Sequence, residues 1–143
     1  MTLTAAWAQA YVRDVIRAVR EGDWERYAAL HRPDVRYSSP TSQCEGIAEL
    51  IERDKAFIEA VPDWTVRVVN MAVDPIARLA VYESVAKGTH AGPPIARSGV
   101  EQPVGEPFEV LSANFVEFDE SGRAQAIRSY FKRFDGSGAA RVG

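Results

Sequence analysis

The sequence predicts an α+β domain in which three N-terminal helices pack on a curved antiparallel sheet, forming a cone-shaped barrel with one internal pocket. In the first half of the chain apolar residues recur at helical spacing, and in the second half they alternate as in strands. Helices that precede the strands, rather than alternating with them, are typical of helices on one face of an antiparallel sheet. The 143 residues fit a single domain, 1–143, with 7–135 structured and 136–143 as a flexible tail.

Helices account for most of the first half. Thr4 can cap a first helix that ends at Gly22, and Asp23 can cap a short second helix that breaks at Pro33. A third helix stops close to Pro62, because proline cannot continue a helix. The other expected elements of this half are a short strand at 35–39, a loop at 40–46 and the third helix itself at 47–60.

Strands are expected in the second half. Apolar alternation predicts them at 64–68, 76–88, 108–118 and 126–134. Residues 89–106 are rich in glycine and proline, which exclude regular structure. We expect this segment to be a mobile lid over the mouth of the pocket.

The composition excludes several classes of function. A net charge of −3, from 17 basic and 20 acidic residues, provides no basic surface for nucleic acid and no membrane anchor. One cysteine and two histidines favour neither a disulfide nor a metal centre, and no glycine-rich phosphate loop occurs. We therefore expect no metal and no cofactor. Without a signal-peptide pattern or a membrane-length apolar run, a cytoplasmic protein is expected.

Asp54 is the most unusual residue of the third helix. The side chains three and four residues away from it are Leu50, Ile51, Phe57 and Ile58. All four are apolar, so the helix places a carboxylate within its apolar face. A buried carboxylate must be paired, hydrogen-bonded or protonated. It is either a general acid or base, or a structural acid at the stripe edge or paired with an arginine on a neighbouring element.

Polar residues also interrupt the predicted strands. Alternate residues of the third predicted strand form an apolar face broken by Ser112 and Asn114, which suits a pocket wall with oriented hydrogen-bonding groups. The alternative is that Asn114 only satisfies nearby backbone groups. Ser129 interrupts an apolar face of the last predicted strand in the same way. Glu83 lies in a mostly apolar strand whose inward face the periodicity does not identify, and His90 opens the glycine-rich segment.

Five short motifs occur along the chain in the same order as in a known superfamily. They are Gly22-Asp23 with Pro33-Asp34 in the segment 19–40, Val61-Pro62-Asp63-Trp64, Gly88-Thr89-His90-Ala91-Gly92, Gly105-Glu106-Pro107-Phe108, and Phe118-Asp119-Glu120-Ser121-Gly122. Together they resemble the nuclear transport factor 2-like superfamily and, within it, the SnoaL-like polyketide cyclases. The resemblance covers residues 7–135 and implies a conical sheet with helices over its mouth.

The resemblance also implies where a site would lie. Related ketosteroid isomerases hold an oxyanion-hole tyrosine, a catalytic base and an oxyanion-hole acid where this chain has Val15, Ser39 and Asn114. Related epoxide hydrolases and cyclases hold an acid where this chain has Ser129. These departures argue against steroid-type isomerisation and make Asp54 a candidate for a relocated acid.

We therefore expect a cyclase that closes a carbocycle in a hydrophobic, polyketide-type intermediate of secondary metabolism, by acid–base chemistry or by shape-directed cycloaddition. The alternatives are an epoxide hydrolase or isomerase that uses Asp54 or Glu83, and a non-catalytic protein that binds a small molecule. The expected catalytic residues are Asp54, Asn114 and Glu83. The expected substrate-binding residues are Tyr11, Val15, Tyr37, Ser39, Phe57, Trp64, Val66, His90, Phe108, Val110, Ser112, Ser129 and Phe131. An apolar strip edged by both signs of charge, on the strand faces opposite the pocket, predicts a homodimer.

Overall fold

A computed structural model describes residues 1–91, 105–134 and 140–142. The predicted lid at 89–106 falls mostly outside these residues, as does most of the predicted tail. The elements, in chain order, are α1 (Ala5–Glu21), α2 (Trp24–Ala29), β1 (His31–Ser38), β2 (Gln43–Glu45), α3 (Ile47–Ala60), β3 (Thr65–Asp74), β4 (Leu79–Thr89), β5 (Pro107–Phe118), β6 (Ala124–Phe134) and β7 (Ala140–Val142). None of these helices has both the length and the apolar character needed to cross a membrane.

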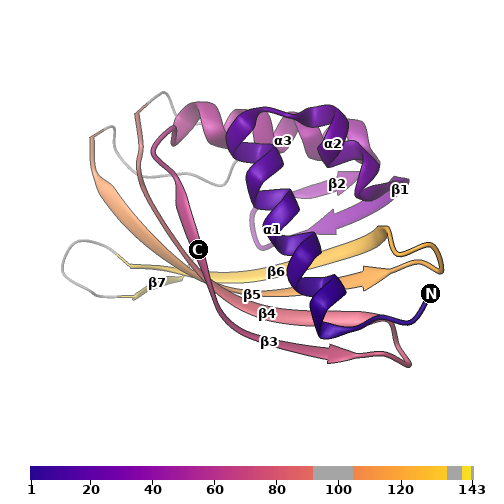
Figure 1. The fold of residues 1–143 in the computed structure, drawn as a ribbon. Helices are drawn as coiled ribbons and strands as arrows, with labels where there is room; N and C mark the ends of the chain where they lie inside the picture. Colours follow the sequence, from indigo (N-terminus) through magenta and orange to yellow (C-terminus); the bar gives the residue numbers. More distant parts are fainter. Residues whose placement is uncertain (92–104, 135–139, 143) are drawn as a thin grey trace.

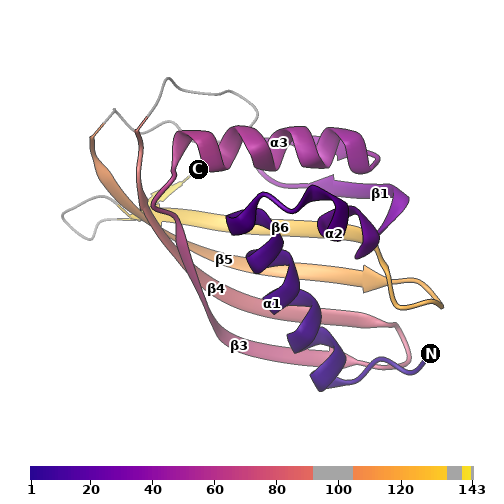
Figure 2. The ribbon, with the colours of Figure 1, turned by 45° about the horizontal axis from the view of Figure 1, so that its top comes forward.

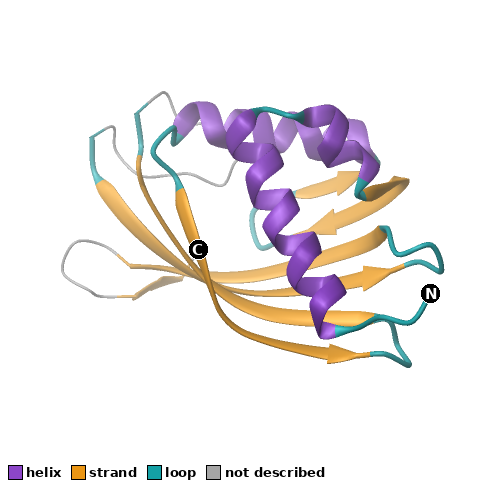
Figure 3. Ribbon diagram, viewed as in Figure 1, coloured by secondary structure: helices purple, strands orange, loops and turns teal. Residues whose placement is uncertain are grey.

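The molecule has two layers, a curved sheet and the three helices that cover one of its faces (Figure 1, Figure 3). The strand order is β2-β1-β6-β5-β4-β3, and β7 pairs with β6 beside this path. Helix α1 runs obliquely across β3 to β6 (Figure 2). The predicted α+β class, with N-terminal helices on a single curved sheet, is confirmed.

Two details of the sheet differ from the prediction. Strand β1 pairs with β6 in parallel, so the sheet is mixed, and the sheet stays open instead of closing into a barrel. The β1–β6 register shifts between His31 and Arg36, a stretch that contains Pro33. Proline has no N–H to donate to a neighbouring strand, so β1 can include Pro33 only where its hydrogen bonding to β6 is irregular. The expected break at this proline is therefore a register shift within a strand.

Helix α1 owes its position to its caps and its apolar stripe. The Thr4 hydroxyl accepts a hydrogen bond from the Trp7 backbone N–H at 3.1 Å, and Gly22 ends the helix with a φ of 68°. Glycine takes this left-handed conformation without the strain that a side chain adds. The Trp7 indole donates to the Gly122 carbonyl at 3.2 Å and ties the start of α1 to the β5–β6 turn.

Several strand limits also differ. Residues 43–45 form β2 in the expected loop, and 140–142 form β7 in the expected tail. Strand β3 continues to Asp74, well past the expected end at 68, and β4 begins only at Leu79. The Asp74 carboxylate accepts hydrogen bonds from the backbone N–H groups of Ile76 and Ala77 at 3.0 and 3.2 Å, which makes this segment a turn.

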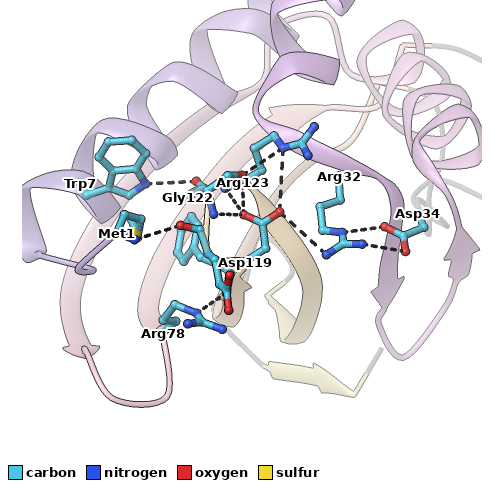
Figure 4. Close-up of polar contacts among 11 residues, drawn as sticks. Met1, Trp7, Arg32, Asp34, Arg78, Asp119, Gly122 and Arg123 are labelled. Atoms are coloured by element: carbon cyan, nitrogen blue, oxygen red, sulfur yellow. Dashed lines mark hydrogen bonds and ion pairs between the residues drawn. The ribbon is translucent and has the colours of Figure 1, made fainter.

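The turn between β5 and β6 is organised by Asp119 (Figure 4). One oxygen of its buried carboxylate accepts hydrogen bonds from the backbone N–H groups of Ser121 and Arg123, at 2.9 and 3.0 Å, and from the Ser121 hydroxyl at 2.7 Å. The other oxygen lies 4.0 Å from Arg32 and 3.9 Å from Arg123. Asp119 thus satisfies the polar groups of a turn that carries β5 into β6.

Replacing Asp119 with alanine is expected to lower the free energy of unfolding by about 2–3 kcal/mol, because three hydrogen-bond donors of the turn lose a charged acceptor. Burial alone would raise the pKa of Asp119, but hydrogen bonds from Ser121 and Arg123 outweigh it and hold the pKa below its ordinary value. A carboxyl group whose pKa is lower in the folded than in the unfolded protein stabilises the fold at pH values above its unfolded pKa of about 3.9. That stability is lost as the pH falls through the folded pKa. Urea denaturation should show that the free energies of unfolding of the wild type and Asp119→Ala differ by a constant amount above about pH 5. This difference should shrink below about pH 4. Glu120→Ala is the matched control, and a difference independent of pH would contradict the assignment.

Candidate functional site

A cavity of about 230 Å³ lies between the helices and the concave face of the sheet. All three helices and strands β1, β3, β4, β5 and β6 contribute to its wall. Its apolar lining residues are Val15, Ile16, Val19, Leu50, Phe57, Trp64, Val66, Ala86, Phe108, Val110, Val116, Ile127 and Phe131. Its polar or amphipathic lining residues are Tyr11, Tyr27, His31, Tyr37, Arg53, Asp54, Tyr82, Ser84, Ser112, Asn114 and Ser129. An apolar cavity with a limited set of convergent polar groups is the usual form of a small-molecule site.

Strands β5 and β6 place their lining residues by simple alternation. Five alternate residues of β5 and three of β6 line the cavity: Phe108, Val110, Ser112, Asn114, Val116, Ile127, Ser129 and Phe131. Successive side chains of a strand point to opposite faces, so one inward residue fixes the direction of the others. This part of the predicted wall lies where the sequence placed it.

Asp54 reaches the cavity from α3 and is paired there. One of its oxygens accepts a hydrogen bond from Arg53 at 2.7 Å, and the other accepts one from the Tyr27 hydroxyl. The Arg53 guanidinium lies 4.4 Å from the centre of the Tyr37 ring and also donates to the Ser42 hydroxyl at 3.0 Å. The Arg53 and Asp54 side chains are each only 15% exposed. Asp54 therefore faces the cavity and is also paired with an arginine, although Arg53 is its neighbour on the same helix and not, as the structural interpretation expected, a residue of another element.

A second polar group joins α1 to β1. The Tyr11 hydroxyl and His31 Nε2 are 2.8 Å apart, and His31 Nδ1 is 2.7 Å from the Tyr27 carbonyl oxygen. His31 is 1% exposed, and burial lowers its pKa below the ordinary value. Burial, together with Tyr82 and Asp54, raises the pKa of Tyr11 well above the ordinary value. In the resting site both groups are therefore neutral at pH 7.

A third polar group lies on the sheet. The Ser129 hydroxyl donates to Asn114 Oδ1 at 2.8 Å, and Asn114 Nδ2 donates to the Ser84 hydroxyl oxygen at 3.3 Å and to the Tyr82 carbonyl at 3.4 Å. Asn114 faces the cavity, as expected. Its amide is nevertheless engaged on both sides by neighbouring strands, so its direct contribution is to orient the two serines.

Three of the residues expected at the site lie elsewhere. Glu83 is exposed and accepts a hydrogen bond from Asn70 at 2.9 Å, because Tyr82 and Ser84 occupy the inward positions of β4. Ser39 lies in the turn between β1 and β2, where its hydroxyl is 3.2 Å from that of Ser42. His90 is buried beyond the end of β4, and its backbone bonds to Gly105 and Glu106 lie outside the cavity wall.

The structure adds residues that the sequence analysis did not assign to the site. The most consequential are His31, Tyr27, Arg53, Tyr82 and Ser84. Tyr27 and His31 are four residues apart, a spacing that hinted at contact across a helix end. No local pattern connects either of them to Tyr11 or Asp54, which approach from other helices.

Comparison with known proteins supports the same fold. TsrD from Streptomyces laurentii is 19% identical, with a TM-score of 0.74 over 90% of each chain. IdmH, a candidate polyketide cyclase from Streptomyces antibioticus, is 21% identical, with a TM-score of 0.68 over 86% of this chain and 90% of IdmH. An LEH-like epoxide hydrolase of M. tuberculosis is 17% identical, with a TM-score of 0.65 over 88% of this chain and 83% of the hydrolase. Likeness at such low identity supports the fold alone.

Sequence comparison identifies the family of the chain. The comparison with curated proteins gives no match. The profile of the SnoaL-like domain, in contrast, matches residues 12–127, which include every helix and strand that lines the cavity except the first part of α1 and most of β6. The chain therefore belongs to the SnoaL-like domain family, within the nuclear transport factor 2-like superfamily.

Proposed function

We propose that the protein is an enzyme that closes a ring in a small, apolar, polyketide-type intermediate. The cavity is the observation that supports this proposal, because apolar and aromatic side chains dominate its wall and its polar groups are oriented by fixed hydrogen bonds. Its volume of about 230 Å³ suits a compact ligand rather than a long extended chain.

Such a cavity promotes ring closure by holding a flexible chain in a folded conformation. Bringing two reacting carbons of one molecule together can contribute about 7–11 kcal/mol to lowering the barrier. Polar groups at fixed positions can polarise a carbonyl or move a proton without reorganising. Ring closure by aldol addition or cycloaddition changes neither the mass nor the redox state of the substrate, so the reaction itself requires no cofactor.

Epoxide hydrolysis is the second candidate function. Asp54 is the one carboxylate among the described residues that line the cavity, and its partner Arg53 lies on the same wall. A carboxylate in this place can activate a water molecule as a general base. Glu83, the other acid considered for this role, is exposed on the opposite face of its strand.

Mass spectrometry separates these functions in one experiment. The protein is incubated with linear poly-β-ketone thioester mimics and, separately, with cyclic terpene epoxides. A cyclase yields a product with the mass of the ketone substrate and a new retention time, or one water less after dehydration of the aldol adduct. A hydrolase instead adds one water to the epoxide. Tight binding of these compounds with no conversion would contradict both and favour a binding protein.

We also propose that the protein forms a homodimer through the outer face of the sheet. Leu111 and Tyr130 are 40% and 55% exposed there, and Phe115 packs against Tyr130 at 5.8 Å between ring centres. The ion pair of Arg128 and Glu117 borders this apolar strip at 2.7 Å. Such a strip suits a two-fold contact between identical surfaces.

Sedimentation tests the dimer directly. The wild type should sediment as a dimer at micromolar concentration, and Leu111→Glu should shift it to monomer, because a carboxylate cannot be buried unpaired in the contact. Ile76→Glu, at a 96% exposed position in the β3–β4 turn, is the control for an added charge. A wild type that is monomeric at these concentrations would rule the contact out.

A further inference from the structure

The two hydrogen bonds of His31 determine which of its nitrogens carries the proton. The Tyr27 carbonyl can only accept, so the nitrogen 2.7 Å from it, Nδ1, must be the donor. In a neutral imidazole the other nitrogen, Nε2, then holds a lone pair. It therefore accepts the Tyr11 hydroxyl proton across the 2.8 Å contact.

This arrangement decides what a ligand meets at Tyr11. The Tyr11 proton is directed at His31, so the phenol oxygen has only lone pairs left for the cavity that it lines. A ligand at this wall consequently meets a hydrogen-bond acceptor backed by a base. This is the reverse of a tyrosine whose hydroxyl is free to donate.

The part of the cavity wall formed by β4, β5 and β6 presents a hydrogen-bond donor instead. The Tyr82 carbonyl can only accept, which orients the Asn114 amide so that its NH₂ faces Tyr82 and Ser84. Its oxygen then accepts from Ser129. The Ser84 oxygen already accepts a hydrogen bond in this chain of bonds, and among the described residues its hydroxyl donates none. Ser84 therefore presents a donor to the cavity that it lines.

We propose that Tyr11 and His31 form a proton relay at the cavity, which removes a proton from a ligand whose carbonyl oxygen is held by Ser84. The proposal rests on the proposed function. The bond from the carbon next to the carbonyl to hydrogen breaks, and its electron pair forms the enolate at Ser84. The released proton passes to the Tyr11 oxygen as the Tyr11 proton passes to His31 Nε2. When the enolate carbon bonds to a second carbonyl of the same ligand, the new alkoxide takes the proton back from Tyr11, and His31 returns to its neutral form.

Burial lowers the pKa of His31 and so disfavours the charge that it acquires, whereas the Tyr27 carbonyl and the Asp54 carboxylate favour that charge. Tyr11 faces His31 from α1, Tyr27 from α2 and Asp54 from α3, and the Asp54 carboxylate favours the protonated ring. Arg53 offsets part of this attraction, since it is hydrogen-bonded to Asp54. In this scheme Tyr11 is the catalytic residue, and His31 and Asp54 are positioning residues that act through it.

The relay can be tested without knowing the natural substrate. The probe is 4-nitrophenol, a small apolar acid whose ionised form has its own visible absorption band. Bound beside Tyr11, it should pass its proton through Tyr11 to His31. We expect the ionisation constant of the bound probe to be about tenfold higher in the wild type than in Tyr11→Phe or His31→Gln, the equivalent of one pKa unit. Tyr130→Phe, which removes an exposed hydroxyl from the outer sheet face, should behave as the wild type.

A second readout follows the proton itself. The chain has two histidines, so nitrogen NMR of the rings is assigned with a single variant, His90→Gln. His31 should carry its proton on Nδ1 without the probe and on both nitrogens with it. Equal ionisation of the probe in the wild type and in Tyr11→Phe would overturn the relay, as would a His31 ring that stays neutral while the probe ionises. If the probe ionises but no ring-closed product forms from any substrate, the relay is supported and the proposed function is contradicted. If ring-closed product forms but the probe does not ionise, the proposed function is supported and the relay is contradicted.

Discussion

Replacing Asp54 with asparagine is expected to lower the free energy of unfolding by about 3 kcal/mol. The substitution keeps the shape of the side chain but leaves the Arg53 guanidinium, inside the protein, without its counter-charge. It also weakens the acceptor of the Tyr27 hydroxyl bond. Removing one partner of a buried ion pair costs about 3–5 kcal/mol, and the lower figure applies because each side chain keeps 15% exposure. Urea denaturation measures the change.

The control for this substitution is Glu59→Gln, an exposed acid on the same helix, which should change stability by less than about 0.5 kcal/mol. A double variant, Arg53→Met with Asp54→Leu, should recover part of the loss, because an apolar pair of similar size needs no counter-charge. If Asp54→Asn lowers the free energy of unfolding by less than about 1 kcal/mol, water solvates the Arg53 guanidinium well enough that it needs no counter-charge.

Filling the cavity is expected to lower kcat/KM by about 70-fold while leaving the fold intact. Ala86 of β4 lies between Val66 of β3 and Val110 of β5 in the register of the sheet, and all three line the cavity. An indole at position 86 would occupy space that the substrate needs. If it excludes about 100 Å² of ligand surface from burial, binding weakens by about 2.5 kcal/mol, or about 70-fold.

The experiment compares kcat/KM and melting temperature for the wild type and Ala86→Trp. The melting temperature should not fall, because the added ring buries apolar surface in existing space. Ala48→Trp adds the same ring at an exposed position of α3 and should change neither quantity. An unchanged kcat/KM in a folded Ala86→Trp protein would place the reaction outside this cavity.

Sequence periodicity by itself determined much of the cavity wall. The alternation along β5 placed Phe108, Ser112 and Asn114 inward, because the pleat of a strand fixes the direction of every second side chain. The spacing on α3 placed Asp54 inward for the equivalent reason in a helix. Both inferences need only local geometry, which a sequence carries completely.

Other features depended on how distant segments meet, and only the tertiary structure decided them. Glu83 lies outside because Ser84 pairs with Ser112 on the inward face, and apolar residues on both sides of β4 left this choice open. The parallel pairing of β1 with β6 joins strands far apart in the chain. The same holds for the contact of Tyr11 with His31, 20 residues away, and of Tyr27 with Asp54, 27 residues away. Polar partners are chosen by packing in three dimensions, so the hydrogen-bonded group of Tyr11, Tyr27, His31 and Asp54 was recognisable only once α1, α2, α3 and β1 were assembled around one cavity.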